Sequence, residues 1–274
     1  MATIRLFEEA AHAAAYAAFR PTYPRAVLDV ISSFIKRNFG PGFGVAVDVG
    51  CGSGQSTFFL SDLFQKVVGV DISAAQIANA RAKCSTKQLP NAKQVEFKTG
   101  SAQELPVETS SADLVTCAQA WHWLDPEVLY VEAKRVLRPR GCLAVYGYGN
   151  VRLANEKGQA LVSAFYDNLR QGGYWHQRRE HIDNEYRAVQ LPFAVTERHD
   201  LSMSSAMTLA QFTGYVSTWS GYCNYCEQHP GNTILKELHK GLKSALDSAS
   251  GTQGEEQRVD VSFPVFVILG LKDL

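Results

Sequence analysis

The sequence predicts an α/β fold built on a doubly wound, mostly parallel β-sheet. Apolar runs of strand length alternate with helical patterns over the first 150 residues, which is typical of a sheet covered by helices on both faces. These runs are apolar at nearly every position, as expected for strands buried on both faces. The first run leads into the glycine-rich turn Asp48–Gly54, and open α/β sheets bind ligands at such junctions.

Each element of this first half follows from its local pattern. Short apolar runs predict strands at Val45–Val49, Lys66–Val70, Val95–Lys98, Ala112–Cys117 and Cys142–Tyr146. Helical spacing between and before them predicts helices at Ile4–Phe19, Pro24–Asn38, Gln55–Leu63, Ala74–Cys84 and Asp125–Leu137.

The pattern changes after Asn150. Two long strand-like segments, Phe193–Met203 and Arg258–Leu271, would most simply extend the same sheet as an antiparallel hairpin. Helical stretches are expected at Asn155–Leu169, Leu209–Thr218 and Thr233–Ser248. We therefore expect a single domain over residues 1–274, with helical cap elements at about 151–190 and 204–254.

Composition narrows the class of function. Lys and Arg number 27, as do Asp and Glu, so the chain has no net field to draw it to nucleic acid or to anionic membranes. The apolar run Phe263–Leu271 is far shorter than the roughly 20 residues that span a bilayer. Scattered cysteines and an acidic N-terminal stretch favour a cytoplasmic protein without a disulfide framework.

The turn has the spacing Asp48-x-Gly50-x-Gly52-x-Gly54. Glycines allow positive φ angles and let backbone approach a ligand closely. A dinucleotide fingerprint would place a small residue where this chain has Gln55, which weakens the case for NAD without excluding it. Asp71 closes the second strand, where its carboxylate can accept hydrogen bonds from ribose hydroxyls in either kind of nucleotide site.

The stretches DVGCGSGQST, VVGVDIS and AQAWHWLD, with AAYAAFRPTYP upstream, resemble the class I S-adenosylmethionine-dependent methyltransferases. The resemblance is strongest to the small-molecule branch that includes trans-aconitate methyltransferase, and it covers about half of the chain. It implies a seven-stranded sheet whose last strand is antiparallel. It also implies that the cofactor is S-adenosylmethionine and that a methyl group is transferred to a small molecule. Carboxylates are one class of such acceptors.

The resemblance also assigns candidate site residues. Gly50, Gly52 and Gly54 would cradle the methionyl part of the cofactor, Asp71 would bind its ribose, and Ile72 would lie against adenine. Ser101 and Ala102 occupy the place where the family often has an acidic residue near adenine. The remaining cofactor-binding candidates are Tyr16 and Arg20, which would fold over the cofactor, with Asp48, Gln119 and Trp121.

An aromatic cluster, Trp121–Trp123, follows the fourth strand, and aromatic faces attract a cation such as a sulfonium. His122 is the candidate catalytic residue, because it alone in this cluster could act as a base near neutral pH. Its alternatives are contact with a ligand and a purely structural role. A carboxylate acceptor needs no base, because it is already ionised.

Two further segments suggest sites. The basic segment Leu169–Arg187 contains Arg170, Arg178, Arg179 and Arg187. It would recognise an anionic substrate or would form an ordinary solvated face, and we expect the solvated face. Cys223, Cys226 and His229 have metal-like spacing without a fourth ligand, so no metal site is expected.

The alternatives to a small-molecule methyltransferase are an NAD-dependent oxidoreductase, a non-catalytic cofactor-binding module and a protein methyltransferase.

Overall fold

A computed structural model describes residues 19–40, 43–86, 94–250 and 258–273. One mixed sheet runs through the molecule in the order β3–β2–β1–β4–β5–β8, and both β7 and the short β6 pair with β8. The strands are β1 (Val45–Val49), β2 (Lys66–Asp71), β3 (Val95–Thr99), β4 (Ala112–Ala118), β5 (Leu137–Tyr148), β6 (Arg152–Leu153), β7 (Val195–Thr208) and β8 (Arg258–Leu271).

Strands β1 to β5 are parallel, and β8 is antiparallel to β5, β6 and β7. The last strand is therefore the antiparallel one, and the predicted fold class is confirmed. The two-residue β6 pairs Arg152 with Ser262, on the same edge of β8 that pairs Tyr148 with Val265. It therefore continues the line of β5, and the other seven strands are those predicted.

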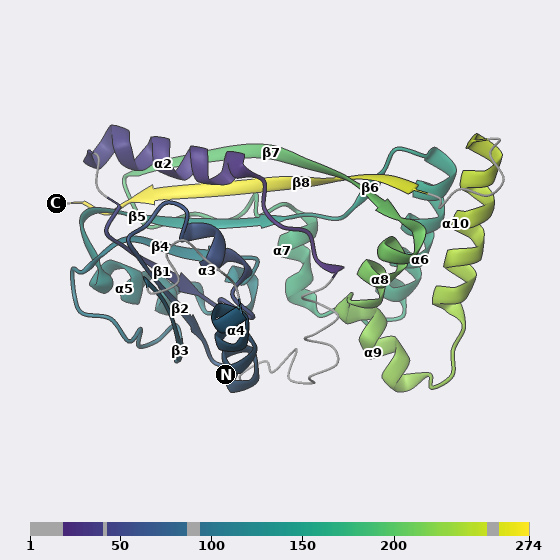
Figure 1. Cartoon of the computed structure of the whole chain (residues 1–274), viewed down its shortest axis with the longest axis horizontal. Coiled ribbons are helices and arrows are strands. Elements are labelled where there is room, and N and C mark those ends of the chain that lie inside the picture. Colours follow the sequence, from purple (N-terminus) through teal and green to yellow (C-terminus); the bar gives the residue numbers. More distant parts are fainter. Residues whose placement is uncertain (1–18, 41–42, 87–93, 251–257, 274) are drawn as a thin grey trace.

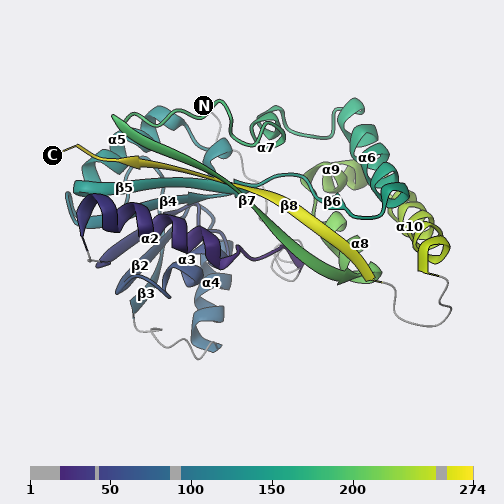
Figure 2. The same cartoon turned by 90° about the horizontal axis from the view of Figure 1, so that it is seen from above.

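Helices cover both faces of the parallel half (Figure 2). They are α2 (Arg25–Phe39), α3 (Gln55–Leu60), α4 (Ala74–Thr86) and α5 (Pro126–Val136). Helix α2 packs its apolar side, including Ile31 and Phe34, into one buried cluster, whereas α5 packs Leu129 into a second cluster. Alternate residues of the central strands divide between the two clusters, because successive strand side chains point to opposite faces. The parallel half is thus a three-layer core.

Strands β7 and β8 extend beyond this core to a group of helices at their far end (Figure 1). We call this group the helical lobe: α6 (Glu156–Gln171), α8 (Leu209–Ser217), α9 (Ser220–Gln228) and α10 (Ile234–Ser250). The short helices η3 (Gln177–Arg179) and α7 (Glu180–Asp183) lie in the chain between α6 and β7. The helices of the lobe lie within the two ranges expected to form cap elements, and their role as a cap stays a prediction.

The elements differ from the expected ones at the start of the second cap segment and at α9. The second cap segment, expected from residue 204, is wrong at its start, because residues 204–208 still pair with 258–262 as part of β7. Helix α9 was not expected, since its polar and aromatic sequence lacks helical apolar spacing. The expected helix Ile4–Phe19 lies outside the described residues except for Phe19.

Within the described ranges, no helix has both the length and the apolar character needed to cross a membrane.

Candidate functional site

The glycine turn after β1 has an open side. Gly50, Gly52 and Gly54 have φ angles of 68°, 53° and 87°, in the region that glycine adopts most readily. A Cβ at Gly50 would lie 2.6 Å from the Ala120 Cβ, and one at Gly54 would lie 2.7 Å from the Phe97 ring. A Cβ at Gly52 would meet nothing within 4 Å. Gly50 and Gly54 are thus required by packing, whereas Gly52 lies against the space where a ligand can approach the backbone.

Asp71 links the end of β2 to this turn. Its carboxylate accepts hydrogen bonds from the backbone N–H groups of Gly52 and Ser73, each at 2.8 Å. Burial raises the pKa of Asp71, and these two amides oppose the rise. A carboxylate has about four acceptor positions, so Asp71 retains capacity for further donors. The next residue, Ile72, is 55% exposed and forms an apolar surface beside it.

Asp48 lies beneath the turn and is fully buried. It accepts hydrogen bonds from the hydroxyls of Ser56, Thr57 and Thr116 at 3.2, 2.7 and 2.9 Å. Burial raises the pKa of Asp48 to about 6, against the lowering effect of the three hydroxyls. The Ser56 hydroxyl is also hydrogen-bonded to the Tyr146 hydroxyl at 2.6 Å. Asp48 therefore holds β1, β4 and the start of α3 together from inside the core.

Ser101 and Ala102 follow β3 and lie beside the end of β2. The backbone N–H of Gly100 donates to the carbonyl of Asp71 at 3.0 Å, which fixes this loop next to Asp71. Ser101 Oγ accepts a hydrogen bond from the backbone N–H of Gln103 at 3.2 Å. The structure thus brings Asp71, Ile72, Ser101 and Ala102 to one edge of the sheet, the carboxyl ends of β2 and β3.

Gln119, directly after β4, has a φ angle of 54°, which is uncommon for a residue with a side chain. Its Nε2 donates to the carbonyl of Tyr148 at 3.1 Å, and its Oε1 accepts from the N–H of Tyr148 at 2.9 Å. The side chain amide therefore acts as an extra rung between β4 and β5. A Cβ at Gly147 would lie 2.6 Å from Gln119 Oε1, so glycine is needed opposite the rung. No pattern in the sequence predicts this positioning role.

Trp121 and His122 lie in η2 (Trp121–Trp123) and are buried. Trp121 Nε1 donates to the Tyr130 hydroxyl at 3.1 Å, and His122 Nδ1 is hydrogen-bonded to the Tyr186 hydroxyl at 2.7 Å. Burial holds the pKa of His122 well below its ordinary value of 6.5. Four nearby cationic or protonatable groups lower it further: Arg179, His181, Arg178 and His176, in decreasing order. His122 is therefore neutral at pH 7 and lies in a positive electrostatic environment.

Arg20 joins the start of the described chain to the helical lobe. Its Nε and Nη2 donate to the hydroxyl and the carbonyl of Thr218 at 2.9 and 3.0 Å. Its Nη1 donates to the Tyr148 hydroxyl at 3.3 Å, and its guanidinium carbon lies 5.3 Å from the centre of the Tyr215 ring. All three nitrogens therefore bind the protein itself. Tyr16, the other residue expected to fold over the cofactor, lies outside the described residues.

The basic segment packs onto the aromatic cluster. Arg178 Nη1 donates to the carbonyls of His122 and Leu124 at 3.4 and 3.0 Å. Arg179 is only 16% exposed and forms a 3.4 Å ion pair with Asp183. The expectation of a solvated face is therefore wrong for these two arginines, although Arg170 and Arg187 of the same segment are exposed.

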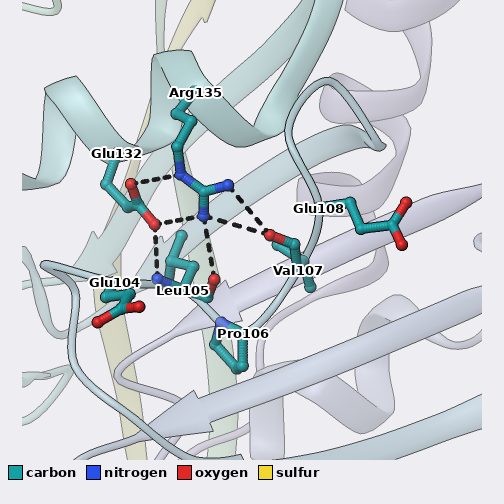
Figure 3. Close-up of a pocket in the computed structure, with 7 residues that line it drawn as sticks. All are labelled: Glu104, Leu105, Pro106, Val107, Glu108, Glu132 and Arg135. Atoms are coloured by element: carbon teal, nitrogen blue, oxygen red, sulfur yellow. Dashed lines mark hydrogen bonds and ion pairs between the residues drawn. The ribbon is translucent and has the colours of Figure 1, made fainter.

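A separate hollow lies between α5 and the loop after β3 (Figure 3). Arg135 there donates to Glu132 and to the carbonyls of Leu105 and Val107, and Glu132 accepts from the N–H of Leu105. Its central polar groups satisfy one another, and neither the glycine turn nor η2 lines it. Among the side chains that the structure describes, no three His, Cys, Asp or Glu residues are grouped to hold a metal ion.

Comparison with known proteins identifies the family. Residues 47–145 match the model of the methyltransferase domain. A protein of Dictyostelium discoideum assigned to the methyltransferases is 34% identical over 263 residues, covering 94% of this chain and 92% of that one. A solved structure from Anaeromyxobacter dehalogenans, assigned as a type II methyltransferase, has a TM-score of 0.77 at 30% identity and covers 94% of this chain and 100% of that one. The trans-aconitate 2-methyltransferase of Deinococcus radiodurans is 40% identical over 106 residues, 38% of this chain and 37% of that protein.

The chain belongs to the methyltransferase family. The expectation of an S-adenosylmethionine-dependent methyltransferase with a Rossmann-like fold is thereby confirmed, and the alternative of an NAD-dependent oxidoreductase loses its support.

Proposed function

We propose that this enzyme transfers the methyl group of S-adenosylmethionine to a small carboxylate-bearing molecule. The observation that carries the cofactor site is the junction of Gly52 and Asp71, which combines backbone open to a ligand with a carboxylate that can accept more hydrogen bonds. Exposed Ile72 beside them gives the apolar surface that an adenine ring requires. These features fit S-adenosylmethionine, whose bound form supplies a methyl group already activated on a positively charged sulfur.

The proposed roles of the predicted site residues differ. Gly50, Gly52 and Gly54 shape the cradle, Asp71 accepts from the ribose hydroxyls, and Ile72, Ser101 and Ala102 line the adenine side. The buried contacts of Asp48 and the amide rung of Gln119 favour positioning roles for both. The contacts of Arg20 with Thr218 favour a role in holding the lobe against β5.

The charges around His122 support an anionic acceptor. Two arginines and two histidines act on this side chain at the carboxyl edge of the sheet, in a chain whose formal net charge is 0. An acceptor carboxylate would be attracted to this region and would arrive ionised, so its oxygen needs no base. A neutral, buried His122 with Nδ1 bound to Tyr186 therefore serves as a wall of the acceptor site.

The protein's further contribution is to align the acceptor atom with the methyl group. Methyl transfer is an in-line displacement, for which orientation and exclusion of water lower the barrier. Trp121 is fixed by Tyr130, and the backbone of η2 is fixed by Arg178, so this wall is rigid. We propose that the helical lobe caps the acceptor site and that residues 1–274 act as a single domain.

Two measurements test the proposal. Calorimetric titration with S-adenosylhomocysteine should show micromolar binding, and NAD titrated in parallel should show none. The protein is then incubated with S-adenosylmethionine and an acceptor, which is supplied either as the free acid or as its methyl ester. The first acceptor is trans-aconitate, because the Deinococcus relative is a trans-aconitate 2-methyltransferase. Release of S-adenosylhomocysteine with an acid but not with its ester is the expected result, whereas turnover of the esters alone would contradict it.

A further inference from the structure

Two buried hydrogen-bond donors beside the aromatic cluster have no hydrogen-bond partner among the described residues. They are Trp175 Nε1 and Arg179 Nε. The two side chains are adjacent, since the guanidinium carbon of Arg179 lies 4.8 Å from the centre of the Trp175 ring. Buried donors are seldom left unpaired in proteins, so two of them side by side point to a ligand that accepts hydrogen bonds.

Arg179 is held at the edge of the sheet where the reaction is proposed. Its Nη2 donates to Asn150 Oδ1, and Asn150 follows β5 by two residues. Arg179 lowers the pKa of His122 more than any other neighbouring charge does. The guanidinium therefore lies close to the carboxyl ends of β4 and β5, near the wall formed by His122.

The N–H groups of Arg179 are only partly hydrogen-bonded within the protein. Asp183 lies 3.4 Å from Nε as an ion pair, but its oxygens already accept the Tyr166 hydroxyl at 2.7 and 2.8 Å and the Asn150 amide at 3.0 Å. Nε of Arg179 makes no hydrogen bond within the described part of the chain, whereas the guanidinium also interacts with the Tyr166 hydroxyl. By contrast, the guanidinium of Arg178 donates to two backbone carbonyls. Of these two arginines, Arg179 is thus the one with a buried N–H, that of Nε, left to donate.

Trp175 is fixed in place by the helical lobe. A Cβ at Gly221 of α9 would lie 2.6 Å from the Trp175 ring and 3.0 Å from its Nε1, so α9 packs closely against the indole on the side that carries the N–H. The rings of Tyr166 and Trp219 lie with their centres 5.0 and 5.9 Å from that of Trp175. The Trp175 side chain, and with it the indole N–H, is therefore held in a fixed position by these contacts.

We propose that Arg179 and Trp175 together bind a carboxylate group of the methyl acceptor, an inference that rests on the proposed function. Guanidinium N–H groups suit carboxylate oxygens in charge and geometry, and the indole N–H adds a second donor that cannot accept. The ligand class is a carboxylic acid in its ionised form. The site selects against the corresponding ester, which lacks the charge.

The test is calorimetric titration of trans-aconitate into the full chain saturated with S-adenosylhomocysteine. Trp175→Phe keeps the aromatic face and removes the N–H, and Arg179→Lys keeps the charge and removes the planar fork. We expect each to weaken binding of the acid by about tenfold or more, the scale of losing a hydrogen bond to a charged group. Arg170→Met, which removes an exposed charge from the same segment, should leave binding within about twofold of wild type.

Equal affinity of wild type, Trp175→Phe and Arg179→Lys for the acid would overturn the inference. So would binding of the trimethyl ester as tight as that of the acid, or no binding of the acid to wild type. Affinity for S-adenosylhomocysteine is measured on every sample. If wild type lacks it, the proposed function itself fails; if a variant alone lacks it, that variant is misfolded and the other decides.

Discussion

The backbone N–H of Gly52 donates a 2.8 Å hydrogen bond to the carboxylate of Asp71, which joins the glycine turn after β1 to the end of β2. Parallel strands β1 and β2 are in register at Asp48 and Gly69, so their carboxyl ends meet at this bond. One residue therefore both holds the turn and presents an acceptor to a ligand. This arrangement makes Asp71 the most informative position at which to test the cofactor site.

Asp71→Ala should weaken binding of S-adenosylhomocysteine by about 1–3 kcal/mol, because hydrogen bonds to a charged acceptor are lost. Asp71→Asn retains one acceptor oxygen and should weaken binding less. Isothermal titration gives both values, and the exposed Asp167→Ala serves as the control that removes the same charge elsewhere. An affinity unchanged in folded Asp71→Ala would remove Asp71 from the cofactor site.

Gly50→Ala should mainly lower the stability of the protein, whereas Gly52→Ala should mainly lower its affinity for the cofactor. Both place a side chain at positive φ, at a cost of about 1–2 kcal/mol, but only Gly50→Ala also meets the Ala120 Cβ. We expect Gly50→Ala to lower the melting temperature more, and Gly52→Ala to lose cofactor affinity while remaining folded. The double variant Gly50→Ala, Ala120→Gly should recover part of the lost stability. Equal melting temperatures for the two single variants would contradict the packing argument.

Gln119→Ala should reduce the free energy of unfolding by about 1–3 kcal/mol, because it removes both hydrogen bonds of the rung to Tyr148. Urea unfolding measures the loss, with the exposed Gln171→Ala as control. A positioning role also predicts slower turnover at nearly unchanged affinity for S-adenosylhomocysteine. A large loss of that affinity instead would identify Gln119 as a direct cofactor ligand.

The pKa of Asp48 is raised from 3.8 to about 6, so the folded protein binds this proton more tightly than the unfolded chain. A group of this kind contributes most to the free energy of unfolding at low pH. That contribution falls by up to about 3 kcal/mol as the pH rises from about 4 through about 6. The stability of wild type relative to Asp48→Asn should therefore decline between about pH 4 and pH 7. Urea unfolding across that range tests the slope, and two parallel curves would show that Asp48 does not titrate as described.

His122→Asn should lower kcat for an acid acceptor by less than about tenfold, whereas removal of a general base typically costs 10²–10⁴-fold. Because the pKa of His122 lies well below 6.5, kcat should also be flat between about pH 6 and 9. Steady-state release of S-adenosylhomocysteine measures both. A loss of a thousandfold, or a titration near neutral pH that disappears in the variant, would restore His122 as the base.

The sheet could be predicted largely from the sequence, because its strands are continuous apolar runs with clear ends. Strands Val45–Val49 and Arg258–Leu271 have the predicted bounds, and Lys66–Asp71 exceeds its prediction by one residue. Helix Ser220–Gln228 was missed because Tyr, Cys and Asn at its positions give no apolar period. Local periodicity is therefore a good guide to buried elements and a poor one to polar helices.

The proximity of candidate site residues could be predicted only where they lie at the ends of recognisable parallel strands. The glycines and Asp71 belong to recognisable strand ends, so their proximity followed from the parallel topology. The rung from Gln119 to Tyr148 and the contact of Arg179 with Asn150 each span 29 positions of the chain. Such pairs depend on how a loop and a strand end meet in space, and no spacing rule in the sequence indicates them.

The most direct test of the central claim is mass spectrometry of an acid acceptor incubated with the protein and S-adenosylmethionine. We predict the methyl ester of trans-aconitate or of another small carboxylic acid, formed in proportion to released S-adenosylhomocysteine. A protein that binds S-adenosylhomocysteine but methylates no acid would contradict the proposed function and would favour a different acceptor or a binding module.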